Sequence, residues 1–156
     1  MKEKFSPLQR STLLLCFFAY ASAYTGRLNL SAALPGLRGG IAMSDTQAGL
    51  FQTVFALVYA AGQIVNGSLV DKINVRRSIA VGLVVSAACN VLFGLTASFL
   101  VMLILWGLNG AAQSMLWTPI VKLVADRFSG HARDRASFVL SITVIFGHFI
   151  AWAISG

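Results

Sequence analysis

The chain has 156 residues, of which 57% are hydrophobic and only 11% are charged, and its formal net charge is +7. Soluble domains carry about a quarter of charged residues, so this composition excludes an ordinary soluble domain. The charges gather in short blocks between long apolar runs, which indicates an all-α, polytopic membrane protein with one domain over residues 1-156. Basic residues in such blocks give no indication of nucleic-acid binding.

Five apolar runs follow one another along the chain. We expect four complete membrane spans at residues 11-34, 47-70, 78-96 and 99-125, and a near-complete fifth at 136-155. Loops are expected at 37-46, 71-77 and 126-135, and a short turn at 97-98. The first run also has features of a cleavable signal peptide, namely a basic start and small residues at 21-23. Its apolar character continues beyond residue 23, so we favour a membrane span.

The basic residues are distributed unevenly between the two ends of these spans. Of the twelve lysines and arginines, ten precede the first span or belong to the segments after the second and fourth spans. By the positive-inside rule these segments are cytoplasmic. We therefore expect a multi-pass protein of the plasma (inner) membrane with a cytoplasmic N-terminus.

One charge, Arg27, lies inside the first span. An arginine at such depth costs roughly 3 kcal/mol on insertion scales, and it usually faces the protein interior or a water-filled cavity. Because only about two helical turns separate it from Leu34, snorkelling outward to the membrane surface stays an alternative.

Polar side chains recur at helical spacing in four of the five spans. The polar seams are Tyr20, Tyr24, Arg27 and Ser31; Gln52, Tyr59, Gln63 and Asn66; Asn109, Gln113 and Trp117; and Ser137, Ser141 and His148. The third span offers only Ser86 and Asn90. One seam alone is typical of hydrogen bonding between helices, but four seams, one with an arginine, indicate a shared polar cavity. The role of His148, as a packing residue or a proton carrier, stays open.

A specific motif follows the second span. It has the pattern G-x-x-x-D-[RK]-x-x-x-[RK]-[RK] and consists of Gly67, Asp71, Lys72, Arg76 and Arg77. It resembles the signature between helices two and three of the major facilitator superfamily. The resemblance implies a gating role, in which the aspartate anchors a gate between the two halves of a transporter and the basic residues pair around it.

Two further stretches resemble the organophosphate:phosphate antiporter family of that superfamily, of the glycerol-3-phosphate and hexose-phosphate transporter type. The fourth span, Asn109-Gly110-x-x-Gln113-x-x-x-Trp117-x-Pro119, is similar to N-G-x-x-Q-x-x-x-W-P-P, with Thr118 in place of the first proline. The first span, Tyr24-x-x-Arg27-x-Asn29, is similar to Y-x-x-R-x-N.

The resemblance implies that Arg27 is one of two arginines that bind a substrate phosphate, the other coming from the C-terminal half. The implied substrate-binding set is Tyr24, Arg27, Tyr59, Gln63, Asn109, Gln113 and Trp117. Three positions depart from the family: Leu28 and Gln63 stand where lysines occur, and Phe146 aligns with a histidine. The cationic set is therefore reduced to Arg27.

We therefore expect most of the N-terminal six-helix half of a secondary active transporter, which moves a small organic anion, phosphorylated, by alternating access. Inorganic phosphate is the expected counter-substrate, and the lipid bilayer and a missing C-terminal half are the expected partners, so that this chain alone does not transport. Two alternatives stay open: a sugar-acid or other carboxylate symporter, and a transporter-like membrane sensor. No metal, phosphate-loop or nucleophile motif is found, so we expect neither enzyme activity nor a cofactor.

Overall fold

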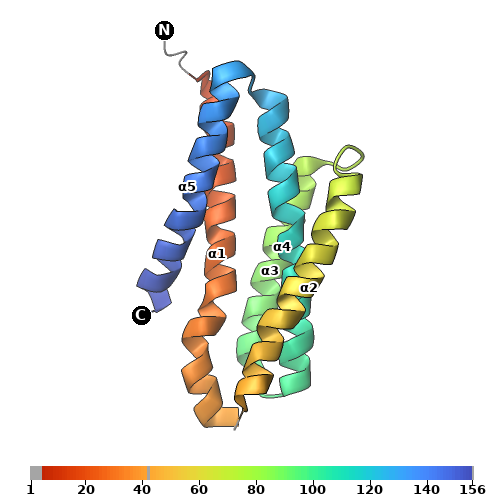
Figure 1. The fold of residues 1–156 in the computed structure, drawn as a ribbon, viewed down its shortest axis with the longest axis vertical. Coiled ribbons are helices and arrows are strands. Elements are labelled where there is room, and N and C mark those ends of the chain that lie inside the picture. The colour runs from red at the N-terminus through yellow and green to blue at the C-terminus, as the bar shows by residue number, and fades with distance from the viewer. Residues whose placement is uncertain (1–4, 42, 156) are drawn as a thin grey trace.

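A computed structural model describes residues 5–41 and 43–155 of the chain. These residues form five helices, α1 (Pro7–Ile41), α2 (Asp45–Leu69), α3 (Val75–Leu95), α4 (Phe99–Arg127) and α5 (Gly130–Ser155), and no strand occurs among them. The helices run along the long axis of an elongated bundle (Figure 1). The all-α fold expected from the composition is confirmed.

Three of the helices, α2, α3 and α4, are long and apolar enough to cross a membrane, as judged by length and composition. The other two, α1 and α5, have 35 and 26 residues. Their apolar runs contain polar side chains such as Arg27 and His148. For these two helices the membrane span stays a prediction.

The helices α1 and α2 begin with the same hydrogen-bonded motif, a serine that exchanges bonds with a glutamine three residues later. The side chain of Ser6 accepts from the Gln9 amide, and the side chain of Gln9 accepts from the Ser6 amide. Ser44 and Gln47 repeat this capping box at α2. Each box satisfies backbone donors that a helix start leaves free, which explains why α1 begins before residue 11.

The expected end of the first helix near Pro35 is wrong, since Pro35 lies within α1 and the helix continues to Ile41. A proline inside a helix removes one backbone hydrogen bond, and a helix of this length retains the others on both sides of it. Most of the loop expected at 37-46 is therefore helical.

The charged loop expected at 126-135 is also mostly helical, because α4 runs to Arg127 and α5 begins at Gly130. Arg133 donates through Nε to the Phe128 carbonyl and through Nη2 to the Ala125 carbonyl, each over 3.1 Å. These bonds satisfy carbonyl groups that the end of a helix leaves without partners. The basic side chain thus closes the end of α4 instead of belonging to an open loop.

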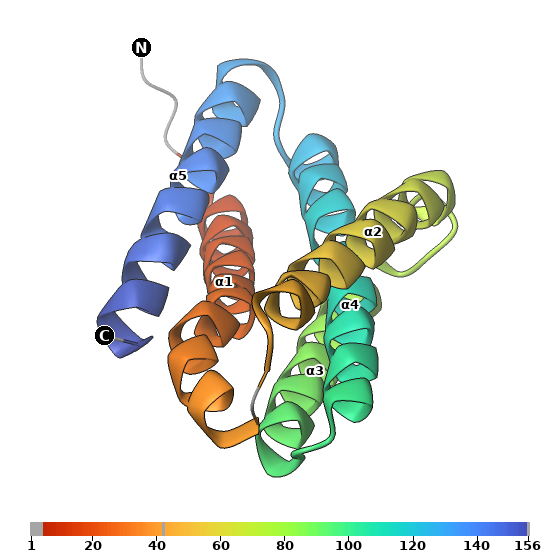
Figure 2. The same ribbon diagram turned by 60° about the horizontal axis from the view of Figure 1, so that its bottom comes forward.

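In space, α4 packs between α2 and α3, while α1 pairs with α5 (Figures 1 and 2). The start of α1, the α2–α3 loop and the α4–α5 connection lie at one end of the bundle (Figure 1). These three segments, each of which carries basic residues, therefore share one end, as the positive-inside count requires. We call it the basic end.

Glycines allow α4 to approach its two neighbours closely. A Cβ atom on Gly82 of α3 would lie 2.7 Å from the Ala112 carbonyl oxygen, and one on Gly110 of α4 would lie 2.8 Å from the Phe55 carbonyl oxygen. Real Cβ atoms do not approach backbone oxygens so closely. The absence of a side chain at these two positions is what sets the helix separation.

A proline in α4 is accommodated by a hydrogen bond from another helix. Pro119 has no amide hydrogen, so the carbonyl of Met115 lacks its usual donor within α4. The hydroxyl of Ser78 on α3 donates to that carbonyl over 3.1 Å. In a membrane protein such a bond replaces one that no lipid can supply.

Candidate anion-binding site

Arg27 faces the inside of the bundle at its middle level. Its Nε donates to Gln113 Oε1 over 3.0 Å, and Gln113 lies at the midpoint of α4. Its guanidinium also contacts Phe55 and Tyr59, which lie close to the middle of α2. The alternative in which Arg27 snorkels outward is therefore wrong: α1 continues well past Leu34, and the side chain turns toward α2 and α4.

Three aromatic rings surround the guanidinium. Its Cζ atom lies 5.1, 5.2 and 4.9 Å from the ring centroids of Tyr24, Phe55 and Tyr59. A guanidinium over an aromatic face is stabilised by the ring quadrupole, but its charge is not neutralised. Among the residues that the structure describes, no carboxylate pairs with Arg27. The two terminal amino groups of Arg27 form no hydrogen bond with any described residue. A planar pair of donors is therefore left for an oxyanion, which guanidinium binds in a bidentate manner.

Gln113 is held so that its carbonyl oxygen meets Arg27. Its Nε2 atom lies 3.2 Å from the Ala23 carbonyl and 3.3 Å from both Ser86 Oγ and Asn109 Oδ1. Because these acceptors surround the amide nitrogen, the oxygen on the other side of the amide must face the guanidinium. Gln113 is buried, so its orientation is fixed by the fold.

Asn109 joins α4 to both α1 and α3. Its Nδ2 donates to the Gly26 carbonyl over 2.9 Å, and its Oδ1 accepts from the Ser86 hydroxyl over 2.6 Å. Asn109 is fully buried. A Cβ atom on Gly26 would lie 3.1 Å from Asn90 Nδ2, so α1 passes close to the polar side chains of α3 here. A buried amide with partners on both sides fixes the place of Arg27 relative to α4.

Two residues of α3 belong to this polar cluster, although polar residues are few in the third apolar run of the sequence. Ser86 bonds to Asn109, and Asn90 Oδ1 accepts from Asn29 Nδ2 over 2.7 Å. The available signal was their spacing of four residues, which puts both on one helix face. With only two polar residues, that face did not stand out from its apolar surroundings.

The remaining predicted residues lie next to this cluster and do not touch the guanidinium. The ring centroid of Trp117 lies 4.8 Å from that of Tyr20, and Tyr20 packs edge-on against Tyr24. Gln63 lies one helical turn beyond Tyr59 on α2, and its Oε1 accepts from the hydroxyl of Thr118 over 2.6 Å. Of the seven predicted residues, Arg27 and four others form a contact network, and Trp117 and Gln63 extend it toward the basic end.

His148 packs against the predicted site from α5. Its ring centroid lies 4.7 Å from that of Tyr24, and its Nδ1 lies 2.7 Å from the Val144 carbonyl of its own helix. His148 therefore contacts the ring of Tyr24 from an exposed position of α5.

The predicted gating motif lies at the basic end, far along α2 from Tyr59. Asp71 forms an ion pair of 2.8 Å with Lys122 of α4, and Lys122 also lies 3.4 Å from Asp126. Within the described ranges, the basic motif residues Lys72, Arg76 and Arg77 are exposed and form no ion pair with Asp71. The partner of Asp71 is thus Lys122, which the motif does not contain. No atom of another element lies within 4 Å of a Cβ built on Gly67, so helix packing does not explain this glycine.

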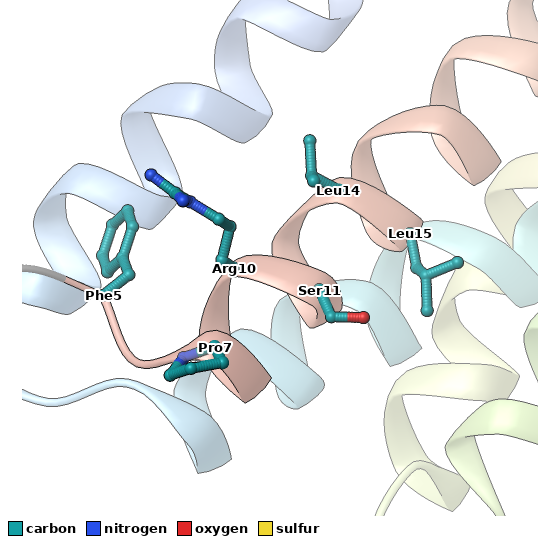
Figure 3. Close-up of a pocket in the computed structure, with 6 residues that line it drawn as sticks. All are labelled: Phe5, Pro7, Arg10, Ser11, Leu14 and Leu15. Atoms are coloured by element: carbon teal, nitrogen blue, oxygen red, sulfur yellow. The ribbon is translucent and has the colours of Figure 1, made fainter.

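Two of the grooves on the described part of the bundle do not contain the residues around Arg27. One, of about 430 Å³, surrounds the first two turns of α1 and is lined by Phe5, Pro7, Arg10, Ser11, Leu14 and Leu15 (Figure 3). The other, also about 430 Å³, lies between α1 and α3 and has Arg76 among mostly apolar neighbours. The candidate site therefore rests on the contacts of Arg27.

Residues 16–156 match the sequence model of the Major Facilitator Superfamily. A probable hexose phosphate transport protein of Chlamydia muridarum is 28% identical over 117 residues, which are 75% of this chain and 26% of that protein. A glycerol-3-phosphate transporter of Bacillus subtilis is 31% identical over 133 residues, 83% of this chain and 30% of that protein.

The membrane sensor protein UhpC of Escherichia coli is also similar, with 31% identity over 105 residues, 67% of this chain and 24% of that protein. The chain thus spans only 24% to 30% of the length of these relatives. No solved structure matches it.

Proposed function

The chain belongs to the major facilitator superfamily, and on this premise we propose that it forms one side of the substrate site of a secondary transporter for a small phosphorylated organic anion. The observation that carries the proposal is the state of Arg27. Its guanidinium lies at the middle of the bundle, is bound through Nε alone, and lacks a carboxylate partner within the described residues. An arginine at membrane depth without a counter-charge is expected to serve a ligand that brings one.

The proposed binding step follows from this geometry. Gln113 and the aromatic rings of Tyr24, Phe55 and Tyr59 hold the guanidinium plane, and its terminal amino groups bind two phosphate oxygens. Because the neighbours are neutral, the bound anion compensates the charge of Arg27. Relatives named for hexose phosphate and glycerol-3-phosphate transport support phosphorylated substrates over other anions.

Transport by alternating access with inorganic phosphate as counter-substrate is part of the same proposal. We place the basic end in the cytoplasm because it gathers the start of α1 and both basic connections. The ion pair of Lys122 with Asp71 joins α4 to the segment that follows α2 there. A pair of this kind, exposed to water, can break and re-form as helices move.

The test is the variant Arg27→Lys in the full-length gene product that contains these residues. Lysine keeps the charge but loses the planar pair of donors, so we expect the affinity for inorganic phosphate and glycerol 3-phosphate to fall about a hundredfold, about 2.8 kcal/mol. Binding to purified protein in detergent measures the loss, and the thermal midpoint shows that the variant is folded.

Arg10→Lys is the matched control, because Arg10 is an exposed arginine of the same helix. It should leave both affinities as they are. Unchanged affinity of Arg27→Lys for both phosphate and a sugar acid would remove Arg27 from the site. If the variant loses affinity for the sugar acid but not for phosphate, the carboxylate alternative is favoured.

A second candidate, a membrane sensor that binds the same anion without moving it, is supported by the similarity to UhpC. Both functions need the Arg27 site, so binding does not separate them. Proteoliposomes do: saturable uptake of glycerol 3-phosphate supports the transporter, and binding without uptake supports the sensor.

A further inference from the structure

Gly147 of α5 lies directly against the side chain of Tyr24 on α1. A Cβ atom built on Gly147 would lie 2.8 Å from both Cβ and Cδ2 of Tyr24 and 2.9 Å from its Cγ. Real Cβ atoms essentially never come within 3.0 Å of another heavy atom. Because the Cβ of Tyr24 is fixed to the backbone of α1, no change of rotamer moves it aside. A side chain at position 147 would therefore displace Tyr24 together with α1.

The ring of Tyr24 is enclosed on its other sides as well. The ring of His148, next to Gly147 on α5, has its centroid 4.7 Å from that of Tyr24. Tyr20 packs edge-on, with a centroid distance of 5.3 Å and an interplanar angle of 87°. Tyr24 is buried as a residue. Close packing of this kind holds a side chain in one rotamer, so α5 fixes the direction of the Tyr24 ring.

The Tyr24 ring in turn supports the guanidinium of Arg27. The two residues are three positions apart and so share one face of α1, and the Arg27 Cζ atom lies 5.1 Å from the ring centroid. The other supports, Phe55, Tyr59 and Gln113, belong to α2 and α4. No described residue of α5 shares a hydrogen bond or a ring contact with Arg27. The contact from α5 to the guanidinium thus passes through Tyr24 (helices α1 and α5 lie side by side in Figure 1).

The direction of the guanidinium plane decides whether the site can bind a phosphate group. Two terminal amino groups bind two oxygens only when the plane faces them, and a binding site has to be held within about 0.5 Å of its productive geometry. The Arg27 Nε donates to Gln113 over 3.0 Å, so a shift of α1 by a few tenths of an ångström changes both this bond and the tilt of the plane.

We propose that Gly147 is a positioning residue of the anion site. By letting α5 contact Tyr24 directly, it holds the Tyr24 ring against Arg27 and orients the two terminal amino groups toward the phosphate. This inference rests on the proposed function, because Arg27 must bind the phosphate group.

The test is Gly147→Ala in the full-length gene product, with binding of inorganic phosphate and glycerol 3-phosphate measured on purified protein in detergent. We expect both affinities to fall about tenfold, or about 1.4 kcal/mol, because the displaced Tyr24 no longer supports the guanidinium plane. Gly49→Ala is the matched control. Gly49 is an exposed glycine of α2 whose Cβ would have no neighbour within 4 Å, so both affinities should stay unchanged.

A double variant separates positioning from a general loss of packing. Tyr24→Gly removes all three atoms that a Cβ at position 147 would meet, so adding Gly147→Ala to it should cost no further affinity. Two single variants test the same link with α5 unaltered. Tyr24→Leu, which lacks the ring, should lose about tenfold in affinity, and Tyr24→Phe, which keeps the ring, should bind as the unaltered protein does. The thermal midpoint shows that each variant is folded.

A lower thermal midpoint in Gly147→Ala with unchanged phosphate affinity would make Gly147 a packing residue and overturn the inference. So would a further tenfold loss from Gly147→Ala in the Tyr24→Gly background, since the effect would then not pass through Tyr24. An equal loss in Tyr24→Phe and Tyr24→Leu would assign anion binding to the Tyr24 hydroxyl and overturn it as well. If the unaltered protein binds neither ligand, the proposed function itself is wrong and this inference falls with it.

Discussion

The helix contacts of the bundle differ in how closely the backbones approach. Glycine contacts accompany the hydrogen bonds of α4 with α2 and α3, whereas α1 meets α3 and α4 through side chains. The helix α4 meets α2 and α3 where Gly110 and Gly82 let backbone atoms approach closely. The helix α1 meets α3 and α4 through hydrogen-bonded side chains, including Asn109 to Gly26 and Arg27 to Gln113. Close backbone packing at a glycine permits a single arrangement of the two helices. A hydrogen-bonded side chain, in contrast, can exchange one partner for another. The α2–α3–α4 row is thus a rigid support, and the seam with α1 is the place for a ligand.

The largest expected effect comes from breaking the glycine contact, with Gly82→Leu. The new side chain meets the Ala112 backbone, which cannot move aside without separating α3 from α4. We expect the free energy of unfolding to fall by roughly 3 kcal/mol. Thermal unfolding of the full-length gene product in detergent measures it.

Gly94→Leu is the control for this variant, since Gly94 belongs to the same helix and a Cβ there has no neighbour within 4 Å. If both substitutions lower the thermal midpoint equally, close packing at Gly82 does not hold the row together and the comparison fails.

A smaller effect is expected from the polar seam, with Asn109→Leu. Leucine has a similar volume but leaves the Gly26 carbonyl and the Ser86 hydroxyl without their partner. The expected loss is about 2 kcal/mol of unfolding free energy, the cost of burying unsatisfied polar groups. A double-mutant cycle with Ser86→Ala should give a coupling energy clearly different from zero. Additive losses would contradict a shared hydrogen-bond network.

The smallest effect is expected at the basic end, with Lys122→Met. The carboxylate of Asp71 is 81% exposed, so water and salt screen its pair with Lys122. The thermal midpoint should fall slightly at low ionic strength and not at all at high ionic strength. A fall as large as that of Gly82→Leu would mean that charge, not glycine packing, joins α2 to α4.

Much of this architecture is predictable because lipid imposes simple requirements. Long apolar runs must be helices in a bilayer, and charged blocks must lie outside it, so the five helices and the shared end of the basic segments follow from the sequence. The seams of α1, α2 and α4 follow from helical spacing, and they do converge on Arg27.

The helix ends were less predictable, and the reason is local. Serine and glutamine three residues apart were readable signals at Ser6 and Ser44, whereas Pro35 is an ordinary stop signal that α1 overrides. Likewise, the bonds of Arg133 to the end of α4 depend on where the next helix turns back. Such bonds cannot be assigned before the turn is known.

The sequence by itself determined that an arginine lies among apolar residues, that polar seams accompany it, and that a superfamily motif follows the second helix. Only the tertiary structure decided that Arg27 points inward, since the direction of a side chain depends on which helices flank it. It also brought in Ser86 and Asn90, and it joined Gln63 to Thr118. Spacing along one helix fixes a face, but the partner across that face is fixed only when helices distant in sequence pack together.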